Sequence, residues 1–173
     1  LKADLQVVVA FRMLPEVVWN MPSIGTINLH GSLLPKFRGA APINWAVITG
    51  EKETGVTTFF LQHEIDTGDL LMQERLPIHP EDTAGELHDR MMTLGAEVVL
   101  KSVQLIQKGG YELQPQDDSQ VSKAPKIFQE TCEINFHDST EAINNFIRGL
   151  SPYPTAWTQL DGLKLKVLKA CPY

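Results

Sequence analysis

An uninterrupted apolar run near the start of the chain is the feature that most constrains its fold. Residues 4–11 read DLQVVVAF, without the polar alternation of a half-exposed strand. Such runs are typical of strands buried between helices in a parallel sheet. An amphipathic helix is predicted over 83–107, and its apolar stripe consists of Leu87, Met91, Leu94, Val98 and Leu105. Together these segments predict a fold of the α/β class.

Turn-forming residues divide the stretch between these two segments into shorter elements. Pro42 and Gly50 stand in the first turn and just past the end of a predicted helix, where each residue type is preferred. Two runs rich in β-branched and aromatic residues are predicted strands, and residues 63–69 form the loop between them. We expect helices over 14–19 and 41–49, and strands over 25–29, 54–62 and 70–78.

The last third of the chain has a different organisation. Residues 109–126 are polar with two prolines, which indicates a linker. Beyond it we expect a strand over 133–136, a helix capped by Ser139 that ends near Gly149, and a hairpin turning at Asp161-Gly162. The predicted division is therefore a first domain over 1–108, a linker over 109–126 and the start of a second domain over 127–173.

Composition excludes several classes of protein. Hydrophobic residues make up 43% and charged residues 21%, and no apolar run approaches the ~20 residues that span a bilayer. We therefore expect a cytoplasmic protein with no membrane contact. The two cysteines, Cys132 and Cys171, are too few and too far apart for a disulfide framework or a metal site.

Charge is unevenly distributed between the two parts. Residues 1–122 hold 9 Lys and Arg against 16 Asp and Glu, which gives −7, whereas residues 123–173 hold 6 against 5, which gives +1; the sum is the net charge of −6. The first part therefore lacks the excess of basic residues typical of nucleic-acid binders. Any RNA contact is expected to use local basic residues such as Lys164, Lys166 and Lys169, for which a role as solvated strand residues is equally plausible.

The run from 28 to 69 carries the candidate chemistry. Asn28 and His30 lie two apart in a predicted strand, so their side chains project from one face and converge. Asp66 lies in the Gly-bounded loop after the next strand. An amide and an imidazolium can donate hydrogen bonds to a carbonyl oxygen that becomes an oxyanion, while the carboxylate accepts a proton. This trio suits one-step transfer of an activated acyl group.

These residues carry a family resemblance. NLHGSLLPKFRG followed by EIDTGD resembles the active-site signature of the 10-formyltetrahydrofolate-dependent formyltransferases, and RGAAPINWA and IRGLSPYPTAW are most similar to the members that formylate initiator methionyl-tRNA. The resemblance implies the later part of a Rossmann-like domain with a mostly parallel sheet, then the start of a small OB-like barrel. It also implies a fragment without the N-terminal part and most of the C-terminal domain.

The same resemblance assigns roles to individual residues. Asn28 and His30 stabilise the oxyanion, Asp66 keeps His30 charged and accepts the proton of the attacking amine, and Arg38 contacts the substrate or clamps its own loop. No metal is implied, and 10-formyltetrahydrofolate is the co-substrate. The residues expected to contact the folate are Arg12, Leu14, Ser32, Leu33, Leu34, Pro35, Gln62, His63, Glu64 and Ile65.

Two alternatives remain at the level of sequence. The amine acceptor is a sugar nucleotide or glycinamide ribonucleotide in one alternative, because the catalytic residues would be the same. In the other, the chain is a folate-binding module without turnover. A full-length enzyme of this kind is expected to be monomeric, whereas a fragment with an unfinished sheet is expected to self-associate.

Overall fold

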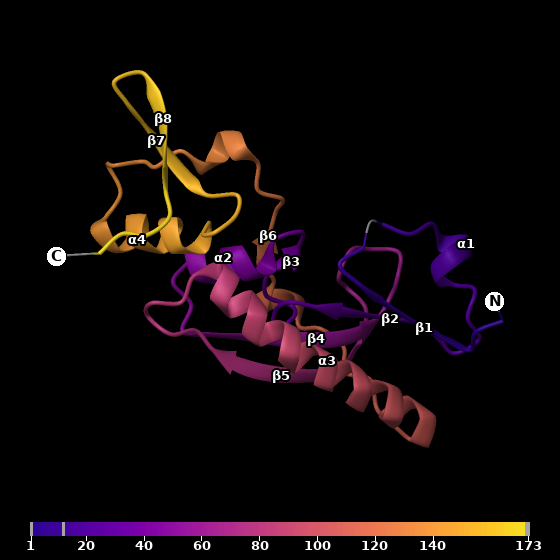
Figure 1. Ribbon diagram of the computed structural model, residues 1–173. Coiled ribbons are helices and arrows are strands. Elements are labelled where there is room, and N and C mark those ends of the chain that lie inside the picture. Colours follow the sequence, from indigo (N-terminus) through magenta and orange to yellow (C-terminus); the bar gives the residue numbers. More distant parts are fainter. Residues whose placement is uncertain (1, 12, 172–173) are drawn as a thin grey trace.

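The computed structural model describes residues 2–11 and 13–171. The larger lobe contains a four-stranded sheet with the long helix packed across it, and a smaller lobe follows toward the C-terminus (Figure 1). In chain order the elements are β1 (Leu5–Val9), α1 (Glu16–Trp19), β2 (Gly25–His30), β3 (Arg38–Gly39), α2 (Pro42–Ile48), β4 (Glu53–Phe60), β5 (Leu70–Pro77), α3 (Ala84–Lys108), η1 (Asp118–Gln120), β6 (Lys123–Ala124), η2 (Gln129–Cys132), α4 (Thr140–Gly149), β7 (Ala156–Leu160) and β8 (Leu163–Val167).

The main sheet has the strand order β1-β2-β4-β5. β1 and β2 are parallel, whereas β2 with β4 and β4 with β5 pair antiparallel. The predicted α/β class is confirmed, but in the described part of the chain the sheet is mixed instead of mostly parallel. The physical reason for the last pair is the short connection over 61–69, which folds β5 back beside β4 as a hairpin. β1 lies at an edge of this sheet, and its Val9 side chain is 54% exposed.

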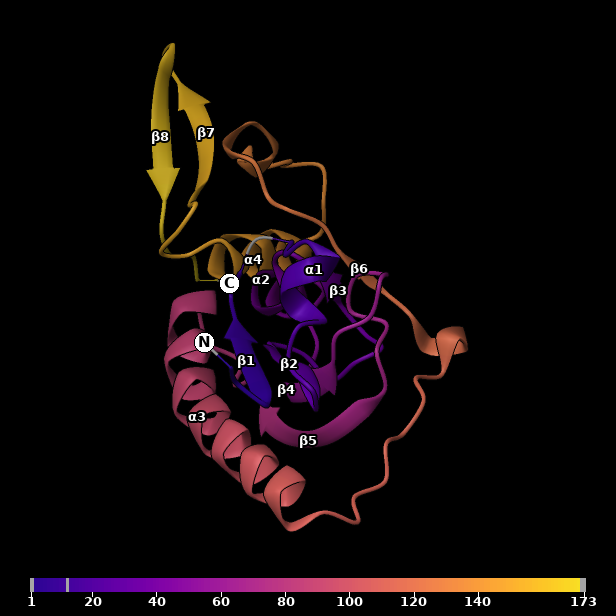
Figure 2. The ribbon, with the colours of Figure 1, turned by 90° about the vertical axis from the view of Figure 1, so that its right-hand side faces the viewer.

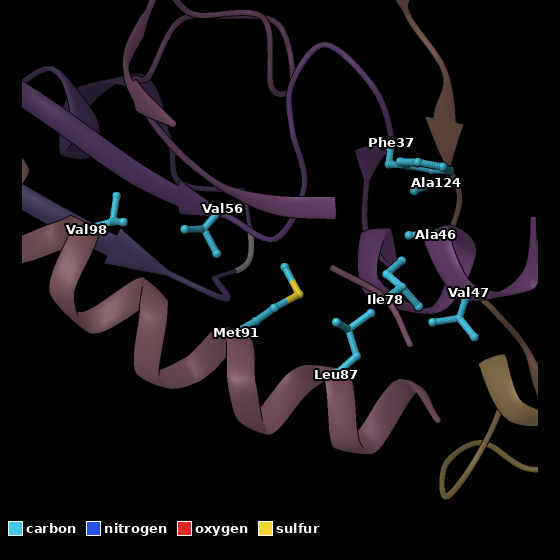
Figure 3. Packing of buried hydrophobic residues seen from close by; sticks show 9 residues of the cluster. All are labelled: Phe37, Ala46, Val47, Val56, Ile78, Leu87, Met91, Val98 and Ala124. Carbon is cyan, nitrogen blue, oxygen red and sulfur yellow. The ribbon is translucent and has the colours of Figure 1, made fainter. Parts of the chain in front are cut away.

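The long helix α3 begins and ends as its sequence predicts. Thr83 and Glu86 form a capping box at its start, and Gly109 follows its last residue with φ of 75°. Figure 3 shows Leu87, Met91 and Val98 pointing from α3 toward the sheet, where they are buried in the main core cluster. None of the described helices combines the length and the apolar character needed to cross a membrane.

The C-terminal lobe is built from α4 and one hairpin. Ser139 accepts a hydrogen bond from the Ala142 N–H at the start of α4, as predicted. β7 and β8 pair through a turn at Asp161 and Gly162, which both have positive φ. The strand predicted over 133–136 was wrong, because this stretch makes one isolated bridge, from Glu133 to Trp157, after the short helix η2.

Residues 109–126 run along the edge of the first lobe on their way to the second, as Figure 2 shows on its right-hand side. These residues form hydrogen bonds with the first lobe. Gln114 exchanges backbone hydrogen bonds of 2.7 and 2.9 Å with Leu70, and β6 pairs in parallel with β3. The segment expected to act as a linker is therefore packed against the loops that surround the predicted site.

Candidate active site

β2 brings Asn28 and His30 to one face, as the alternation of strand side chains requires. Both are nearly inaccessible to solvent, with exposures of 4% and 6%. Asp66 comes from the loop after β4, and its Oδ2 lies 3.7 Å from Nδ1 of His30. Asn28 Oδ1 has no hydrogen-bond partner among the described residues. The structure thus brings the predicted trio together and leaves one buried polar atom of it for a ligand to satisfy.

The ring of His30 is fixed from the side opposite Asp66. Its Nε2 lies 2.9 Å from the carbonyl oxygen of Phe37. A carbonyl only accepts, so Nε2 carries the hydrogen and donates it. This leaves Nδ1 as the nitrogen that faces Asp66 and a substrate. An imidazolium in this position has one N–H available for an oxyanion.

Asp66 is held in an uncommon backbone conformation. Its φ is +57°, in the left-handed region that costs a non-glycine residue about 1–3 kcal/mol unless its surroundings impose it. Its Oδ2 accepts a hydrogen bond of 2.9 Å from the Gly39 N–H, and its carbonyl oxygen accepts one of 2.8 Å from Gln116 Nε2. The carboxylate is therefore oriented by neighbours on two other segments.

The trio opens onto a cavity of about 1120 Å³. Asn28, His30 and Asp66 all line it, between α1 and the loop after β4 on one side and α3 on the other. Its volume exceeds the ~300–1,000 Å³ common for pockets that take one small ligand. Of the residues predicted to contact a folate, the cavity wall contains Leu14, Gln62, His63, Glu64 and Ile65. Arg12 lies outside the described residues.

His63 connects this loop to α1. Its Nε2 lies 3.4 Å from Glu16 Oε1, and its ring meets the Trp19 ring edge-on at a centroid distance of 5.5 Å. Glu16 and Trp19 line the same cavity. His63 thus joins the two parts of one wall.

The turn at 32–35 does not reach the cavity lining. Ser32 is fully buried and donates a hydrogen bond of 2.6 Å to the Lys36 carbonyl, and Leu34 packs with Phe59 and Leu70. The N–H of Leu34 donates to Thr57 Oγ1. Folate contact was expected here for Ser32, Leu33, Leu34 and Pro35. We propose instead that the turn has a structural role and fixes the backbone just before Phe37.

Arg38 is not among the residues that line the cavity. Its guanidinium donates hydrogen bonds of 3.1 and 2.7 Å to Gln116 Oε1 and one of 2.9 Å to Asp118 Oδ1. These hydrogen bonds favour a structural role for Arg38, which holds its own loop in place, over contact with a substrate.

Several wall residues carried no chemical signal in the sequence. Met13 lies on the α1 side, while Met91, Met92 and Gly95 present the face of α3 to the cavity. Exposure of Met92, at 63%, sets it apart from the buried stripe. Flexible thioether side chains suit an apolar wall that must fit a ligand. The adjacent pair Met91-Met92 on the predicted helix is the one sequence feature that could have indicated this wall. Within the described ranges, no group of three or more His, Cys, Asp or Glu side chains is placed to hold a metal ion.

An α/β domain that places amide and imidazole donors beside a loop carboxylate, within an apolar cavity, has the site of a group-transfer enzyme. Residues 1–103 match the family model described as formyl transferase, and residues 126–173 match that of the formyl transferase C-terminal domain. The chain belongs to the formyl transferase family. Its first part is the Rossmann-like formyltransferase domain, with a mixed sheet.

Curated relatives that match nearly the whole chain include methionyl-tRNA formyltransferases. The one from Azobacteroides pseudotrichonymphae is 60% identical over 166 residues, which cover 93% of this chain and 51% of the relative. The one from Parabacteroides distasonis is 55% identical, with coverage of 98% and 56%. The chain spans about half the length of the curated relatives it matches.

Solved structures share the fold. A 4-N formyltransferase from Francisella tularensis matches with a TM-score of 0.82 at 21% identity, covering 95% of this chain and 69% of that one. An N-formyltransferase from Helicobacter canadensis, in complex with folinic acid and dTDP-3-aminofucose, matches with a TM-score of 0.73 at 28% identity, covering 83% and 53%.

Proposed function

We propose that this chain carries the active site of an enzyme that transfers the formyl group of 10-formyltetrahydrofolate to the α-amino group of initiator methionyl-tRNA, in the cytoplasm, for translation initiation. The observation that carries the proposal is the convergence of Asn28, His30 and Asp66 at one cavity, with 3.7 Å between His30 Nδ1 and Asp66 Oδ2. Identities of 55–60% to methionyl-tRNA formyltransferases support the choice of acceptor.

The reaction needs no covalent intermediate on the protein. The neutral amine attacks the formyl carbon, and a tetrahedral species forms whose oxygen bears the negative charge. Asn28 Nδ2 and the Nδ1–H of a charged His30 donate to that oxygen, and loss of one such donor typically costs roughly 2.7–4 kcal/mol of barrier. Asp66 accepts the proton of the amine. The bond from the formyl carbon to folate N10 then breaks, and N10 takes up a proton.

The cavity offers space for the folate beside these residues. Its wall includes residues 62–65, the loop that we propose contacts the pterin ring, and Leu14 supplies an apolar contact. The folinic acid in the 28%-identical Helicobacter enzyme supports a folate as co-substrate. We assign no metal to the reaction.

For the tRNA, we propose contact through the C-terminal lobe. Lys164, Lys166 and Lys169 remain the candidates. Lys164 Nζ lies 3.8 Å from the centroid of the Trp157 ring, and Lys169 Nζ lies 3.9 Å from Glu81 Oε2. We retain 1–108, 109–126 and 127–173 as the proposed division into catalytic domain, connecting segment and tRNA-binding-like domain, in an enzyme that acts as a monomer.

A sugar nucleotide is the second candidate acceptor. The Helicobacter enzyme with dTDP-3-aminofucose favours it, although at 28% identity against 55–60% for the tRNA enzymes. Glycinamide ribonucleotide has only the shared catalytic trio in its favour.

The test is a comparison of acceptors. The full-length enzyme is incubated with 10-formyltetrahydrofolate and, in separate reactions, with methionyl-tRNA, a dTDP-amino sugar and glycinamide ribonucleotide. We expect kcat/KM for methionyl-tRNA to exceed kcat/KM for each small amine by at least ~10³-fold, because an enzyme specific for the tRNA binds the tRNA as well as the amine in the transition state. A higher value for either small amine would overturn the choice of acceptor. Folate binding without transfer to any of them would identify a folate-binding module.

A further inference from the structure

One short loop touches both titratable groups of the proposed trio. The Phe37 carbonyl accepts the hydrogen bond from His30 Nε2, and two residues later the Gly39 N–H donates to Asp66 Oδ2, each at 2.9 Å. The position of the backbone at 37–39 therefore sets both the orientation of the imidazole and that of the carboxylate. A shift of this loop moves the two groups together.

The backbone conformation of this loop depends on contacts with other segments. Phe37 has a φ of +60°, a conformation that a bulky side chain rarely adopts without support. Its buried ring supplies part of that support by packing in the main core cluster. Further support comes from Ser122, whose Oγ accepts from the Phe37 N–H and whose carbonyl accepts from the Arg38 N–H, each at 2.9 Å.

Gln116 binds the two catalytic loops to each other. Its Nε2 donates hydrogen bonds of 2.8 Å to the carbonyl oxygens of Asp66 and Gly68. Its Oε1 accepts from the guanidinium of Arg38. One side chain thus uses its donor end for the loop that carries Asp66 and its acceptor end for the loop that orients His30.

We propose that Gln116 and Ser122 are positioning residues of the active site. Ser122 acts on His30 and Asp66 through the loop at 37–39, and Gln116 acts through its hydrogen bonds to the loop that carries Asp66 and to Arg38. The inference rests on the proposed function and goes beyond it, because neither residue lines the cavity. Both belong to the segment between the two regions matched by the family models. The connection between the lobes is then a working part of the catalytic geometry as well as a tether.

A purely structural role makes a different prediction. If the two side chains only held β6 beside β3, their loss would lower stability and leave the turnover of the folded enzyme unchanged. A positioning role lowers kcat while the cavity still binds the folate, because displacement of reacting groups by about 1 Å can cost ~10²-fold in rate. It also changes the hydrogen bond of His30 Nε2, which is observable without turnover.

The experiment compares four variants of the full-length enzyme: Ser122→Ala, Ser122→Thr, Gln116→Ala and Gln120→Ala. Thr keeps the hydroxyl that accepts from Phe37. Gln120 is an exposed control whose side-chain amide, among the described residues, donates to Asp117 alone. For each, kcat and the folate KM are measured well below the thermal unfolding midpoint. The imidazole N–H signals are recorded by NMR with ¹⁵N-labelled histidine, and the His30 signal is assigned by its loss in His30→Ala.

We expect Ser122→Ala and Gln116→Ala to lower kcat by about 10–100-fold with the folate KM within about threefold. The Nε2–H signal of His30 should weaken through faster exchange with water in Ser122→Ala. Ser122→Thr and Gln120→Ala should match the unmodified enzyme in both readouts. Equal kcat and an unchanged His30 signal in both alanine variants would overturn the positioning role. An unmodified enzyme that transfers no formyl group would instead overturn the proposed function, and the NMR comparison would still decide the role of Ser122.

Discussion

Gly68 is the position where one added methyl group should disturb the catalytic loop most. It lies two residues after Asp66, and its carbonyl oxygen accepts a hydrogen bond from Gln116. A Cβ at this position would lie 1.7 Å from the carbonyl oxygen of Phe60 and 3.0 Å from Cδ2 of Phe59. Both obstacles belong to β4, which pairs with a strand on each side. Gly68→Ala must therefore displace the loop.

The displacement can be estimated from these distances. Ordinary contact begins near 3.4 Å, so the shortfall is 3.4 − 1.7 = 1.7 Å. If strand and loop share the adjustment, the loop moves by about 1 Å, which breaks the 2.9 Å hydrogen bond from the Gly39 N–H to Asp66. Misplacement of a catalytic group by ~1 Å can cost about 10²-fold in rate, which corresponds to ~2.7 kcal/mol of barrier.

The assay is formyl transfer to methionyl-tRNA by the full-length enzyme at saturating 10-formyltetrahydrofolate. Thr67→Ala is the matched control, because it adds no bulk and, within the part of the chain that the structure describes, removes a single side-chain hydrogen bond, to the Glu64 carbonyl of the same loop. We expect kcat to fall by about 10²-fold in Gly68→Ala and by less than threefold in the control. A folded Gly68→Ala enzyme with kcat within threefold of the unmodified one would refute the reasoning from loop position.

Two further predictions concern stability and thiol reactivity. Leu87 is fully buried in the main core, so Leu87→Ala should lower the free energy of unfolding, measured in urea, by about 2–5 kcal/mol. Leu100 is exposed on the same helix, and Leu100→Ala should change this free energy by less than ~1 kcal/mol. Equal effects would contradict the assigned faces of α3. Burial raises the pKa of the Cys132 thiol, whereas Cys171 is exposed. At about pH 8, iodoacetamide should therefore label Cys171 in the folded protein and Cys132 only after unfolding. Labelling is followed by mass spectrometry, and equal rates for the two cysteines would contradict the burial of Cys132.

Periodic features of the fold could be predicted from the sequence. The stripe on α3 and the Asp161-Gly162 turn involve neighbours along the chain, whose spacing fixes their geometry. The same holds for Asn28 and His30, since alternation along a strand puts them on one face. The proximity of Asp66 came from the resemblance alone, because no spacing rule relates a loop to a strand 36 residues earlier.

Contacts from side chain to backbone between distant segments could not be predicted. Gln116 and Ser122 lie in a polar stretch with linker composition, and their bonds to 37–39 and 66–68 leave no periodic trace in the sequence. The turn at 32–35 shows the converse difficulty. Its place next to His30 in the motif predicts ligand contact, whereas Ser32 and Leu34 are buried, and we propose a structural role for the turn.

Asn28 and His30 are proposed to stabilise the transition state of formyl transfer. The decisive experiment measures folate Kd and single-turnover formyl transfer for Asn28→Ala and His30→Ala in the full-length enzyme, with His79→Ala, an exposed histidine outside the cavity, as control. We predict that each site variant loses at least ~10² in the rate of transfer while its folate Kd stays within about threefold, and that the control is unaffected. Transfer at a near-normal rate by either folded site variant would contradict the claim.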